Sequence, residues 1–534
     1  MTDPRLEETL RDPSFYPHRP LRVDVIQTHI SYIFLAGTLV YKIKKAVDFG
    51  FLDFTTLEKR RYFAEEELRL NRRLAPSIYR EVVPISASGD GRLVLGDRGE
   101  IVEYALVMER IPEDRMLQRL LEEGKVTPPV MRDIARRVYE FHCTADTGGE
   151  IDRIGSIETI RFNHRENFDQ TKPFIGLTIT EDRYNFISAY ATDFMNRKES
   201  LFLKRVEDHR IRDCHGDLHL QHICLGDTVI IFDCIEFNRR FRFLDVAAEI
   251  AFLAMDLDFN GYSFFGDVFI DAYVAESDDS EINELINFYK CYFAYVRGKV
   301  IGFRVAEKGI AQDEREDARR LASRYFEQAY GYAARLEKPA VVIMTGLMGT
   351  GKSALAVAAA SPLGASIVRT DVVRKELLGI DPAERRCESF GSGIYSADMN
   401  RRTYDAALKA AALLLREGRS VIIDASFKKR EERRSAREIA VETGADFFIV
   451  ECRSPEEILR KRLDERQAKG ADASDGRWEI LKDQREAFEI ILDGETAPGK
   501  HVTIDTSQPP EGCLSTMIGA VRLRGKAGER TPQA

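Results

Sequence analysis

A glycine-rich segment at residues 346–353, Gly-Leu-Met-Gly-Thr-Gly-Lys-Ser, has the residue types and spacing of a phosphate-binding loop. Glycines let such a loop wrap closely around phosphate oxygens, which backbone N–H groups and the start of the next helix then bind. Lys352 would reach the β- and γ-phosphates, and the Ser353 hydroxyl would bind Mg²⁺. The segment therefore predicts an ATP site whose nucleotide-binding residues are Gly346, Gly349, Thr350, Gly351, Lys352 and Ser353.

Two aspartates follow apolar runs further along the chain, where the strands of an α/β sheet end and ligands bind. Asp424 closes the run SVIID, and it is typical of a carboxylate that holds Mg²⁺. Asp371 closes ASIVRTD, where it could take a proton from an acceptor hydroxyl, and Arg374 one turn later could bind an anionic substrate. Either aspartate could instead cap the helix that follows it.

Two arginines four residues apart, Arg462 and Arg466, share one face of a predicted helix. In a phosphoryl-transfer enzyme such arginines offset the charge on the transferring group. The alternative is an ordinary solvated basic face.

The order of these motifs resembles one group of P-loop kinases. The loop is followed by RTDVVRKEL, SVIIDASF, RLDER and SDGRWEILKDQ, an order similar to that of gluconate kinase, polynucleotide 5′-kinase and zeta-toxin-like enzymes. The resemblance covers about residues 340–505. It implies ATP-dependent phosphorylation of a hydroxyl, and it leaves the acceptor open because the group's acceptors range from sugars to nucleic-acid ends.

A second constellation lies earlier in the chain, in DCHGDLHLQHICL (213–225) and VIIFDCIEF (229–237). It resembles the catalytic segment of the aminoglycoside/choline phosphotransferase family, a branch of the protein-kinase-like fold. The resemblance implies that Asp217 orients and deprotonates the acceptor hydroxyl. It also implies that Asp233 binds the Mg²⁺ bridging the phosphates, with help from Glu236.

Upstream segments fit the same family, over about residues 25–335. Lys42 and Lys44 alternate onto one face of a predicted strand. Lys42 is the better candidate for the lysine that binds the α- and β-phosphates, because Val40 would then lie beside the adenine. Glu67 is the best candidate for the helical partner of that lysine, and residues 105–112 resemble the hinge between the family's two lobes.

This segment departs from the family pattern at His222, where the family has an asparagine as its second metal ligand. Imidazole is a poor ligand for Mg²⁺ but a better one for Mn²⁺, so His222 as a ligand predicts a preference for Mn²⁺. In the alternative, His222 only hydrogen-bonds within its loop. The expected nucleotide loop also offers a single glycine, Gly37. Two hypotheses follow: an active kinase, or a degenerate domain that senses ATP and regulates.

The same histidines permit a hypothesis of another class. Four of the nine histidines lie between residues 209 and 222. His215, His219 and His222, with Asp217 and Asp233, could form the transition-metal site of a hydrolase. Such sites usually recruit a second cluster of ligands elsewhere, and the sequence offers none.

The elements that position these residues divide at Lys338-Pro339, where a helix must end. We expect an α+β domain over residues 1–337, similar to aminoglycoside phosphotransferases, and an α/β P-loop domain over 338–534. In the first domain the patterns predict strands at 23–35, 38–47, 91–96 and 101–109, helices at 56–74, 127–145 and 182–210, a strand–loop–strand segment at 211–237, and helices from 245 to 337. In the second, strands and helices alternate, and the tail after Thr506 is poorly patterned.

Composition narrows the function classes. With 44% hydrophobic and 31% charged residues, the 534-residue chain is typical of a soluble protein of two or three domains. Of its net charge of −9, residues 1–337 carry −11 and residues 338–534 carry +2. This acidic balance disfavours nucleic acid as a partner, and a nucleic-acid-end kinase remains the third choice. Without an apolar run of membrane-spanning length or a signal peptide, we expect a cytoplasmic protein.

Both halves together, with YKIKKAVDFGFLDFTTLEKR and LNRRLAPSIY, resemble fused bacterial proteins that join an aminoglycoside phosphotransferase-like domain to a P-loop kinase domain. The resemblance implies two ATP sites and small-molecule acceptors bearing hydroxyls. It does not establish aminoglycosides as the acceptors.

Overall fold

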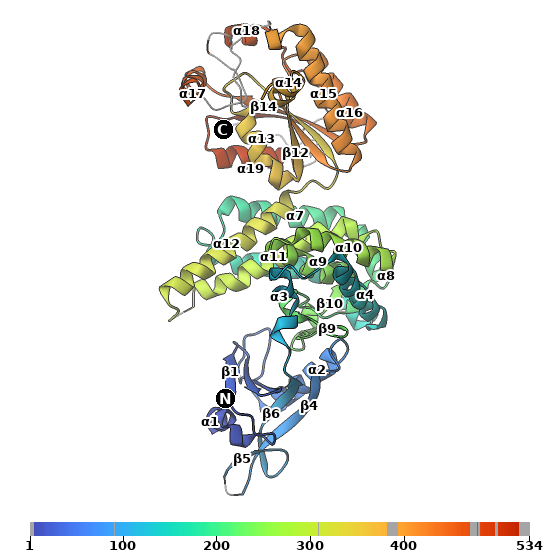
Figure 1. Ribbon diagram of the computed structural model, residues 1–534, viewed down its shortest axis with the longest axis vertical. Coiled ribbons are helices and arrows are strands. Elements are labelled where there is room, and N and C mark those ends of the chain that lie inside the picture. Colours follow the sequence, from blue (N-terminus) through green and yellow to red (C-terminus); the bar gives the residue numbers. More distant parts are fainter. Residues whose placement is uncertain are drawn as a thin grey trace. The chain divides into compact units, whose positions relative to one another are not determined.

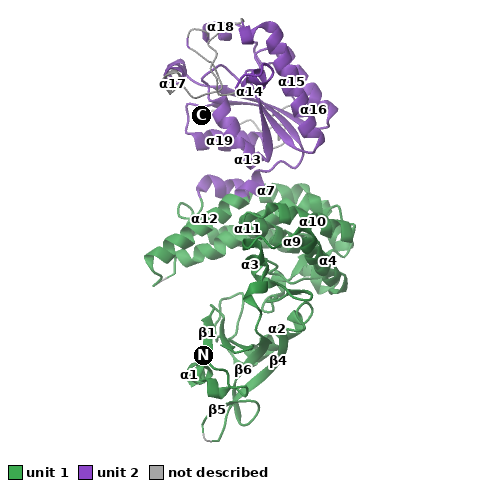
Figure 2. Cartoon of the chain, viewed as in Figure 1, with its two compact units in different colours: residues 1–179, 188–329 green, residues 180–187, 330–534 purple. Residues whose placement is uncertain are grey.

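The computed structural model describes residues 5–89, 91–307, 309–381, 393–469, 478, 481–496 and 500–522. The chain forms two compact units (Figure 2). Unit 1 contains residues 1–179 and 188–329, and unit 2 contains residues 180–187 and 330–534. Within the described ranges, no helix has both the length and the apolar character needed to cross a membrane.

Unit 1 begins with an antiparallel sheet of six strands in the order β1-β2-β3-β6-β4-β5 (Figure 1). The strands are β1 (Val23–Gln27), β2 (Ser31–Ala36), β3 (Leu39–Lys44), β4 (Tyr79–Ala87), β5 (Leu93–Leu95) and β6 (Glu100–Glu109). Helix α2 (Leu57–Asn71) starts at Thr56, whose hydroxyl accepts the N–H of Lys59, and it contacts β6 and β4. This packing brings the buried Glu67 beneath the sheet.

Two features of this sheet differ from the sequence prediction. The strand expected over 23–35 is divided into β1 and β2, because the Thr28 hydroxyl accepts the N–H of Ser31 and forms a turn. Strand β4 was not predicted, since Pro84 within it cannot donate a ladder hydrogen bond. The strand tolerates this proline through irregular pairing with β6 beside Ile85.

The rest of unit 1 is mainly helical. Its helices, including two that continue into unit 2, are α3 (Leu117–Glu122), α4 (Pro128–Thr144), α5 (Glu150–Ile154), α6 (Ile157–Thr171), α7 (Glu181–Arg197), α8 (Glu199–Glu207), α9 (Val246–Phe259), α10 (Ser263–Ser277), α11 (Ile282–Val305) and α12 (Gln312–Ala334). The segment 182–210 predicted as one helix is two, α7 and α8, and α5 and α6 were not predicted. Helix α9 is the centre of this part, because every residue from Val246 to Leu257 is buried.

Two short antiparallel ladders precede α9 and its neighbours. One joins β7 (Ile211–Asp213) to β10 (Phe243–Asp245), and the other joins β8 (Ile223–Leu225) to β9 (Val229–Ile231). These ladders fix the two ends of the segment that carries Asp217, His222 and Asp233.

Unit 2 is a parallel five-stranded sheet with the order β12-β13-β11-β14-β15. Its strands are β11 (Ala340–Thr345), β12 (Ala365–Arg369), β13 (Ser420–Asp424), β14 (Asp446–Arg453) and β15 (His501–Asp505). Its helices are α13 (Lys352–Leu363), α14 (Thr370–Glu376), α15 (Ala397–Arg416), α16 (Arg430–Glu442), α17 (Glu456–Lys469), α18 (Leu481–Glu486) and α19 (Pro510–Arg522). Helices α15 and α16 cover one face, and α13 lies beside α19 on the other (Figure 1).

The α/β rhythm predicted for this half is present. The described part of the tail after Thr506, which is poorly patterned in sequence, contains a helix. Residues 510–522 form α19, which buries Cys513, Met517, Ile518 and Val521. This apolar face packs against α13, so a helix that looked weakly patterned is stabilised by its tertiary partner.

Candidate functional site

The glycine-rich loop of unit 2 leaves the central strand β11 and enters α13. Gly346 has a φ of +130°, and a Cβ there would lie 2.4 Å from the carbonyl oxygen of Cys452. Gly351, with a φ of +79°, immediately precedes the first residue of α13, Lys352. Both positions need glycine, and the loop places the positive end of a helix where phosphates would bind.

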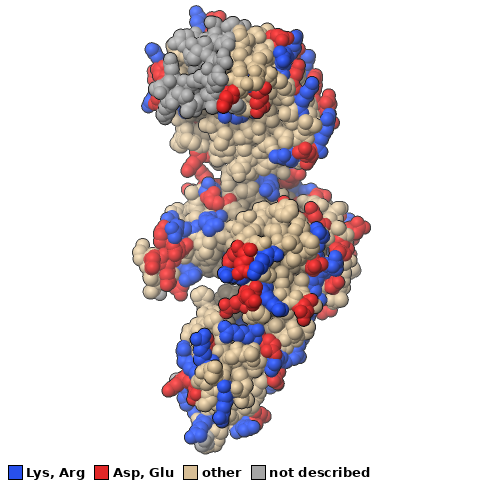
Figure 3. Space-filling model, viewed as in Figure 1, with Lys and Arg blue, Asp and Glu red and all other residues tan. Residues whose placement is uncertain are grey.

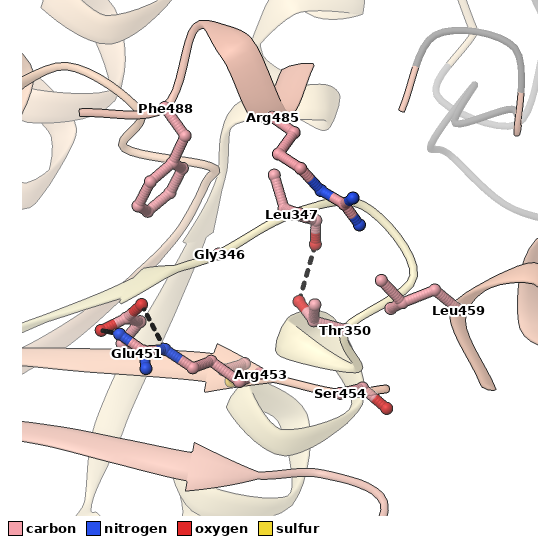
Figure 4. Close-up of a pocket in the computed structure, with 10 residues that line it drawn as sticks. Gly346, Leu347, Thr350, Glu451, Arg453, Ser454, Leu459, Arg485 and Phe488 are labelled. Atoms are coloured by element: carbon pink, nitrogen blue, oxygen red, sulfur yellow. Dashed lines mark hydrogen bonds and ion pairs between the residues drawn. The ribbon is translucent and has the colours of Figure 1, made fainter. Parts of the chain in front are cut away.

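The lysine of this loop folds back over it. Lys352 Nζ donates to the carbonyl oxygens of Gly346 at 2.9 Å and Leu347 at 2.7 Å. The Thr350 hydroxyl donates to Leu347 O at 2.6 Å (Figure 4). Ser353 lies in the first turn of α13, beside the lysine. Lys352 and Thr350, which lie where phosphates would bind, therefore form hydrogen bonds within the loop itself.

A cavity of about 370 Å³ adjoins the loop, in the size range of small-molecule sites. The loop residues Gly346, Leu347 and Thr350 form one side (Figure 4). The end of β14 supplies Glu451, Cys452, Arg453 and Ser454, helix α17 supplies Leu459, and α18 and the residues after it supply Arg485 and Phe488. Glu451 accepts from Arg453 Nε at 2.7 Å and lies 3.1 Å from His501 Nε2. These contacts fix the polar end of the cavity, while Phe488 supplies an apolar wall.

The two predicted aspartates lie near the loop. Asp424 is buried at the end of β13, where it pairs in register with Met344 of β11, and its carboxylate lies 3.4 Å from Arg369 Nε. Asp371 is the second residue of α14 rather than a strand end. Burial raises the pKa of Asp371, and the negative charge of Asp424 adds to this shift while Arg374 opposes it. The charge of Asp424 therefore disfavours the ionised form of Asp371.

The predicted arginines have different surroundings. Arg374 is buried, donates to Asn400 Oδ1 at 2.9 Å and stacks on Tyr395, so it is fixed against the start of α15. Arg462 donates to Gly349 O at 3.4 Å and so contacts the loop directly. Arg466 lies in α17, but its side chain is outside the described residues, as is most of the motif at 474–484.

Two further residues support the loop and were not predicted. The Thr506 hydroxyl donates to Thr350 O at 2.8 Å, and Arg462 donates to Thr506 O at 2.6 Å. Gln484 Oε1 accepts the N–H of Met348 at 2.8 Å. A threonine or a glutamine does not by itself indicate contact with a phosphate-binding loop. Each of these two residues reaches the loop only because the folded sheet brings the two segments together.

In unit 1, two lysines and three carboxylates form a continuous ionic network. Lys42 Nζ lies 2.7 Å from Glu67 Oε1 and 2.8 Å from Asp233 Oδ1. Lys44 lies 2.8 Å from Glu67 Oε2 and also pairs with Glu236. Burial opposes the charge on Lys42, but Asp233 and Glu67 hold its pKa well above the usual value. Sheet, helix α2 and the segment after β9 meet at this network.

A glutamate that the sequence analysis did not single out accepts hydrogen bonds from the backbone of the turn that carries Asp217. The Glu249 carboxylate accepts the backbone N–H groups of His215, at 2.9 Å, and Gly216, at 2.6 Å. His142 Nε2 lies 2.9 Å from Glu249, and its Nδ1 lies 2.7 Å from the Tyr273 hydroxyl. The sequence could have indicated this role, because Glu249 is a single glutamate within the apolar run of α9 and a buried charge needs hydrogen-bonding partners.

The histidines close to Asp217 form a compact cluster. His219 and His222 have ring centroids 3.9 Å apart, and each has a ring nitrogen 3.5 Å from Asp217 Oδ2. Burial favours a protonated Asp217, but these histidines hold its pKa below the usual value. His215 instead contacts Phe232 O through Nε2, and burial lowers its pKa to about 4. The predicted residues Asp217, His222 and Asp233 are thus brought together.

Charge on the visible face is mixed. Acidic and basic side chains are interspersed over the described parts of both units (Figure 3). On the described residues of this face the two signs of charge alternate, unlike the extended basic stripe typical of a nucleic-acid surface.

Comparison with known proteins identifies relatives that match most of the chain and others that match part of it. The uncharacterized proteins Rv2004c of Mycobacterium tuberculosis and Mb2027c of Mycobacterium bovis are each 30% identical over 455 residues, covering 85% of this chain and 88% of the relative. A UPF0200 protein of Aeropyrum pernix is 31% identical over 155 residues, covering 28% of this chain and 75% of that protein. Residues 341–491 match the AAA domain family. The C-terminal unit is therefore a P-loop nucleotide-binding domain.

Solved structures are similar to about a third of the chain. A gluconokinase from Sinorhizobium meliloti 1021 is 21% identical, covers 34% of this chain and 91% of its own, and has a TM-score of 0.26. The Mycobacterium tuberculosis APS kinase CysC, in complex with AMPPNP and APS, is 20% identical over 34% of this chain and 98% of its own, with a TM-score of 0.25.

Proposed function

The chain belongs to the family of the uncharacterized mycobacterial proteins, and we propose that it is an ATP-dependent phosphotransferase whose C-terminal unit phosphorylates a small-molecule hydroxyl. One observation carries this proposal. The loop at 346–353 joins the central parallel strand to α13, and Asp424 ends the neighbouring strand. This arrangement would hold a triphosphate and its metal at one edge of the sheet.

In this proposal the loop residues Gly346, Gly349, Thr350 and Gly351 bind phosphate oxygens through their backbone, and Lys352 neutralises the β- and γ-phosphates. Ser353 and Asp424 would hold Mg²⁺. Hydroxyl and carboxylate oxygens are the donors that Mg²⁺ prefers, so these residues fit the ion. When bound, Mg²⁺ would offset the negative charge of the phosphate groups.

The remaining residues of unit 2 would act on the acceptor and the transferred group. Asp371 would take the proton of the acceptor hydroxyl, and its raised pKa makes it a stronger base than an ordinary carboxylate. Arg462 and Arg466 would offset charge on the phosphoryl group. Arg374 is fixed by its contacts with Asn400 and Tyr395, so it would support the acceptor site as a stationary residue and would not move to close over the acceptor.

For unit 1 we propose a second ATP site with the architecture of aminoglycoside phosphotransferases. The contacts of Lys42 with Glu67 and Asp233 support it, because a phosphate-binding lysine needs a fixed helical partner and a nearby metal ligand. Asp217 would be the base, and Asp233 would hold the metal. A regulatory unit that binds ATP without transfer is the second candidate, since the expected asparagine ligand is replaced by His222.

Phosphoryl transfer by the full-length chain tests the proposal. Purified protein is incubated with γ-labelled ATP and a panel of sugars, sugar acids, nucleosides and aminoglycosides, and labelled products are separated. Lys352→Ala and Lys42→Met serve as matched variants, one for each proposed site. Transfer that is lost in Lys352→Ala but kept in Lys42→Met supports the C-terminal assignment. Turnover unchanged in Lys352→Ala contradicts it.

A further inference from the structure

Arg297 of α11 is a partly buried cation without an ionic partner. Within the residues that the structure describes, no carboxylate forms an ion pair with its guanidinium, and its Nε is buried without a hydrogen-bond partner. Burial of a charged group without a counter-charge is costly, and proteins retain such costs mainly at functional sites. The guanidinium therefore points to an anion that this chain does not itself supply.

Two aromatic rings support this guanidinium. It lies over the ring of Tyr325 from α12, 5.7 Å from the centroid. Tyr325 is buried and stacks on Phe259 of α9, with ring centroids 3.7 Å apart and planes at 4° to each other. A ring beneath a guanidinium orients it and leaves its in-plane N–H donors available to an anion.

Helix α9 connects this arginine to the loop that carries Asp217. Phe252 of α9 stacks on Phe293 of α11, with ring centroids 4.4 Å apart, and it also lies 5.7 Å from the ring of His219. Arg297 is one helical turn after Phe293, so the two side chains share one face of α11. Helices α9 and α11 pack side by side in the helical part of unit 1 (Figure 1). Arg297 therefore lies on the side of α11 that faces α9 and the Asp217 loop.

The charge of Asp217 acts on Arg297 although the two form no ion pair. Burial opposes the positive charge of the guanidinium, but Tyr325, Asp217 and Asp256 raise its pKa. Asp256 is engaged elsewhere, because it accepts the N–H of Leu220 at 3.0 Å. The Asp217 side chain is 31% exposed and is the base in the reaction proposed for unit 1. This arrangement suits an acceptor whose hydroxyl meets the base and whose second polar group meets the guanidinium.

We propose that Arg297 binds an anionic group, a carboxylate or a phosphate, on the acceptor that unit 1 phosphorylates. The inference rests on the transfer reaction proposed for unit 1 and names its acceptor class, a hydroxy acid or a sugar phosphate. In that reaction the acceptor oxygen attacks the γ-phosphorus, the bond from this phosphorus to the β,γ-bridging oxygen breaks, ADP leaves, and Asp217 takes the hydroxyl proton. The ammonium groups of an aminoglycoside would be repelled by Arg297.

The test measures acceptor binding to the full-length chain in the presence of AMPPNP as the unreactive nucleotide. Calorimetry compares two anionic compounds, glucuronate and glucose 6-phosphate, with neutral glucose and with the aminoglycoside kanamycin. Arg297→Met removes the charge and keeps a long side chain over Tyr325. We expect an anionic compound to bind the wild type and to lose affinity at least about tenfold in Arg297→Met, with the affinity for AMPPNP unchanged. Arg324→Met, at an exposed arginine that lies over Phe259, is the matched control and should change neither affinity.

The stability of the ligand-free protein gives a second measurement. Because Arg297 has no ionic partner in the described residues, Arg297→Met should leave the midpoint of urea unfolding unchanged or raise it. An arginine with only a structural role would lower the midpoint when it is replaced.

Four results would overturn the proposal: no binding of either anionic compound, unchanged anion affinity in Arg297→Met, an equal loss of AMPPNP affinity, or a lower unfolding midpoint in the ligand-free variant. Transfer from γ-labelled ATP in a Lys352→Ala background separates this inference from the proposed function. Transfer to kanamycin and to neither anionic compound would mean that only the acceptor class is wrong. Anion binding that depends on Arg297, without transfer, would support the anion site and contradict the reaction proposed for unit 1.

Discussion

Lys42 and Lys44 are expected to separate nucleotide binding from stability, although they lie two residues apart and share Glu67. Lys44 is 4% exposed and lies between Glu67 and Glu236, whose side chains are 1% and 7% exposed. Lys44→Met would leave Glu236 without this cation. Breaking a buried ion pair in this way costs about 3–5 kcal/mol of unfolding free energy.

Lys42→Met should affect stability less. Glu67 keeps Lys44 as its partner, and the Asp233 side chain is 43% exposed, so water can solvate its free carboxylate. The expected loss is about 1 kcal/mol, as for exposed ion pairs. Binding of ATP to unit 1 should nevertheless disappear in Lys42→Met, because this lysine is the one beside Asp233.

The stability difference should depend on pH. Burial raises the pKa of Glu236, so its protonated form is favoured in the folded state. The unpaired Glu236 of Lys44→Met therefore costs least below the unfolded pKa of a glutamate, and the cost grows as pH rises through the raised folded pKa. We expect the deficit of Lys44→Met to be larger at pH 8 than at pH 5.

Urea unfolding monitored by circular dichroism measures both variants. Trp478 is the single tryptophan and belongs to unit 2, so its fluorescence transition is an internal control that should not move. Calorimetry in a Lys352→Ala background isolates ATP binding to unit 1. Equal destabilisation by the two substitutions, or nucleotide binding lost only in Lys44→Met, would refute this division of roles.

Four further predictions concern unit 2. Lys352→Ala should leave the unfolding curve unchanged and lower ATP turnover about 100-fold or more in a coupled assay; wild-type turnover would contradict the loop assignment. Asp371→Asn should lower kcat with little change in ATP affinity, whereas Asp424→Asn should raise the Mg²⁺ concentration required, and identical Mg²⁺ titrations would argue against separate roles. Because burial raises the pKa of Asp371, wild-type kcat should fall on acidification at a higher pH than the ordinary aspartate value, as a pH–rate profile would show. Gly346→Ala should destabilise unit 2 by about 2–4 kcal/mol in the Trp478 transition, since its Cβ meets Cys452 O; a smaller loss would mean that the loop can shift.

The sequence predicted best what local chemistry determines. The loop at 346–353 needs glycines with particular backbone angles and a strand and helix at its flanks, and all of these are readable from adjacent residues. The position of Asp424 at the end of a strand could be predicted for the same reason. Asp371 was displaced by two residues, from a strand end to a helix start, because strand and helix propensities overlap there.

Long-range support could not be predicted in the same way. The Glu249 carboxylate accepts two backbone N–H groups from the turn that carries Asp217. The residues next to Glu249 in the sequence do not indicate which groups these donors are. The proline in β4 concealed a strand whose pairing with β6 on one side and β5 on the other outweighs its poor propensity. Helix α19 owes its stability to α13, more than a hundred residues earlier.

The bond between Thr506 and the loop also constrains the order in which the site can be made. Thr350 obtains its hydroxyl partner from a residue 156 positions later, and Arg462 lies between them in sequence. During synthesis, which proceeds from the N-terminus, the glycine-rich loop emerges long before the strand that supports it. Contacts of such high sequence separation also form late and slow folding. A nascent chain that has just exposed residues 346–353 therefore has the phosphate-binding motif without its supporting bonds, and the motif acquires its final shape only after β15 has joined the sheet.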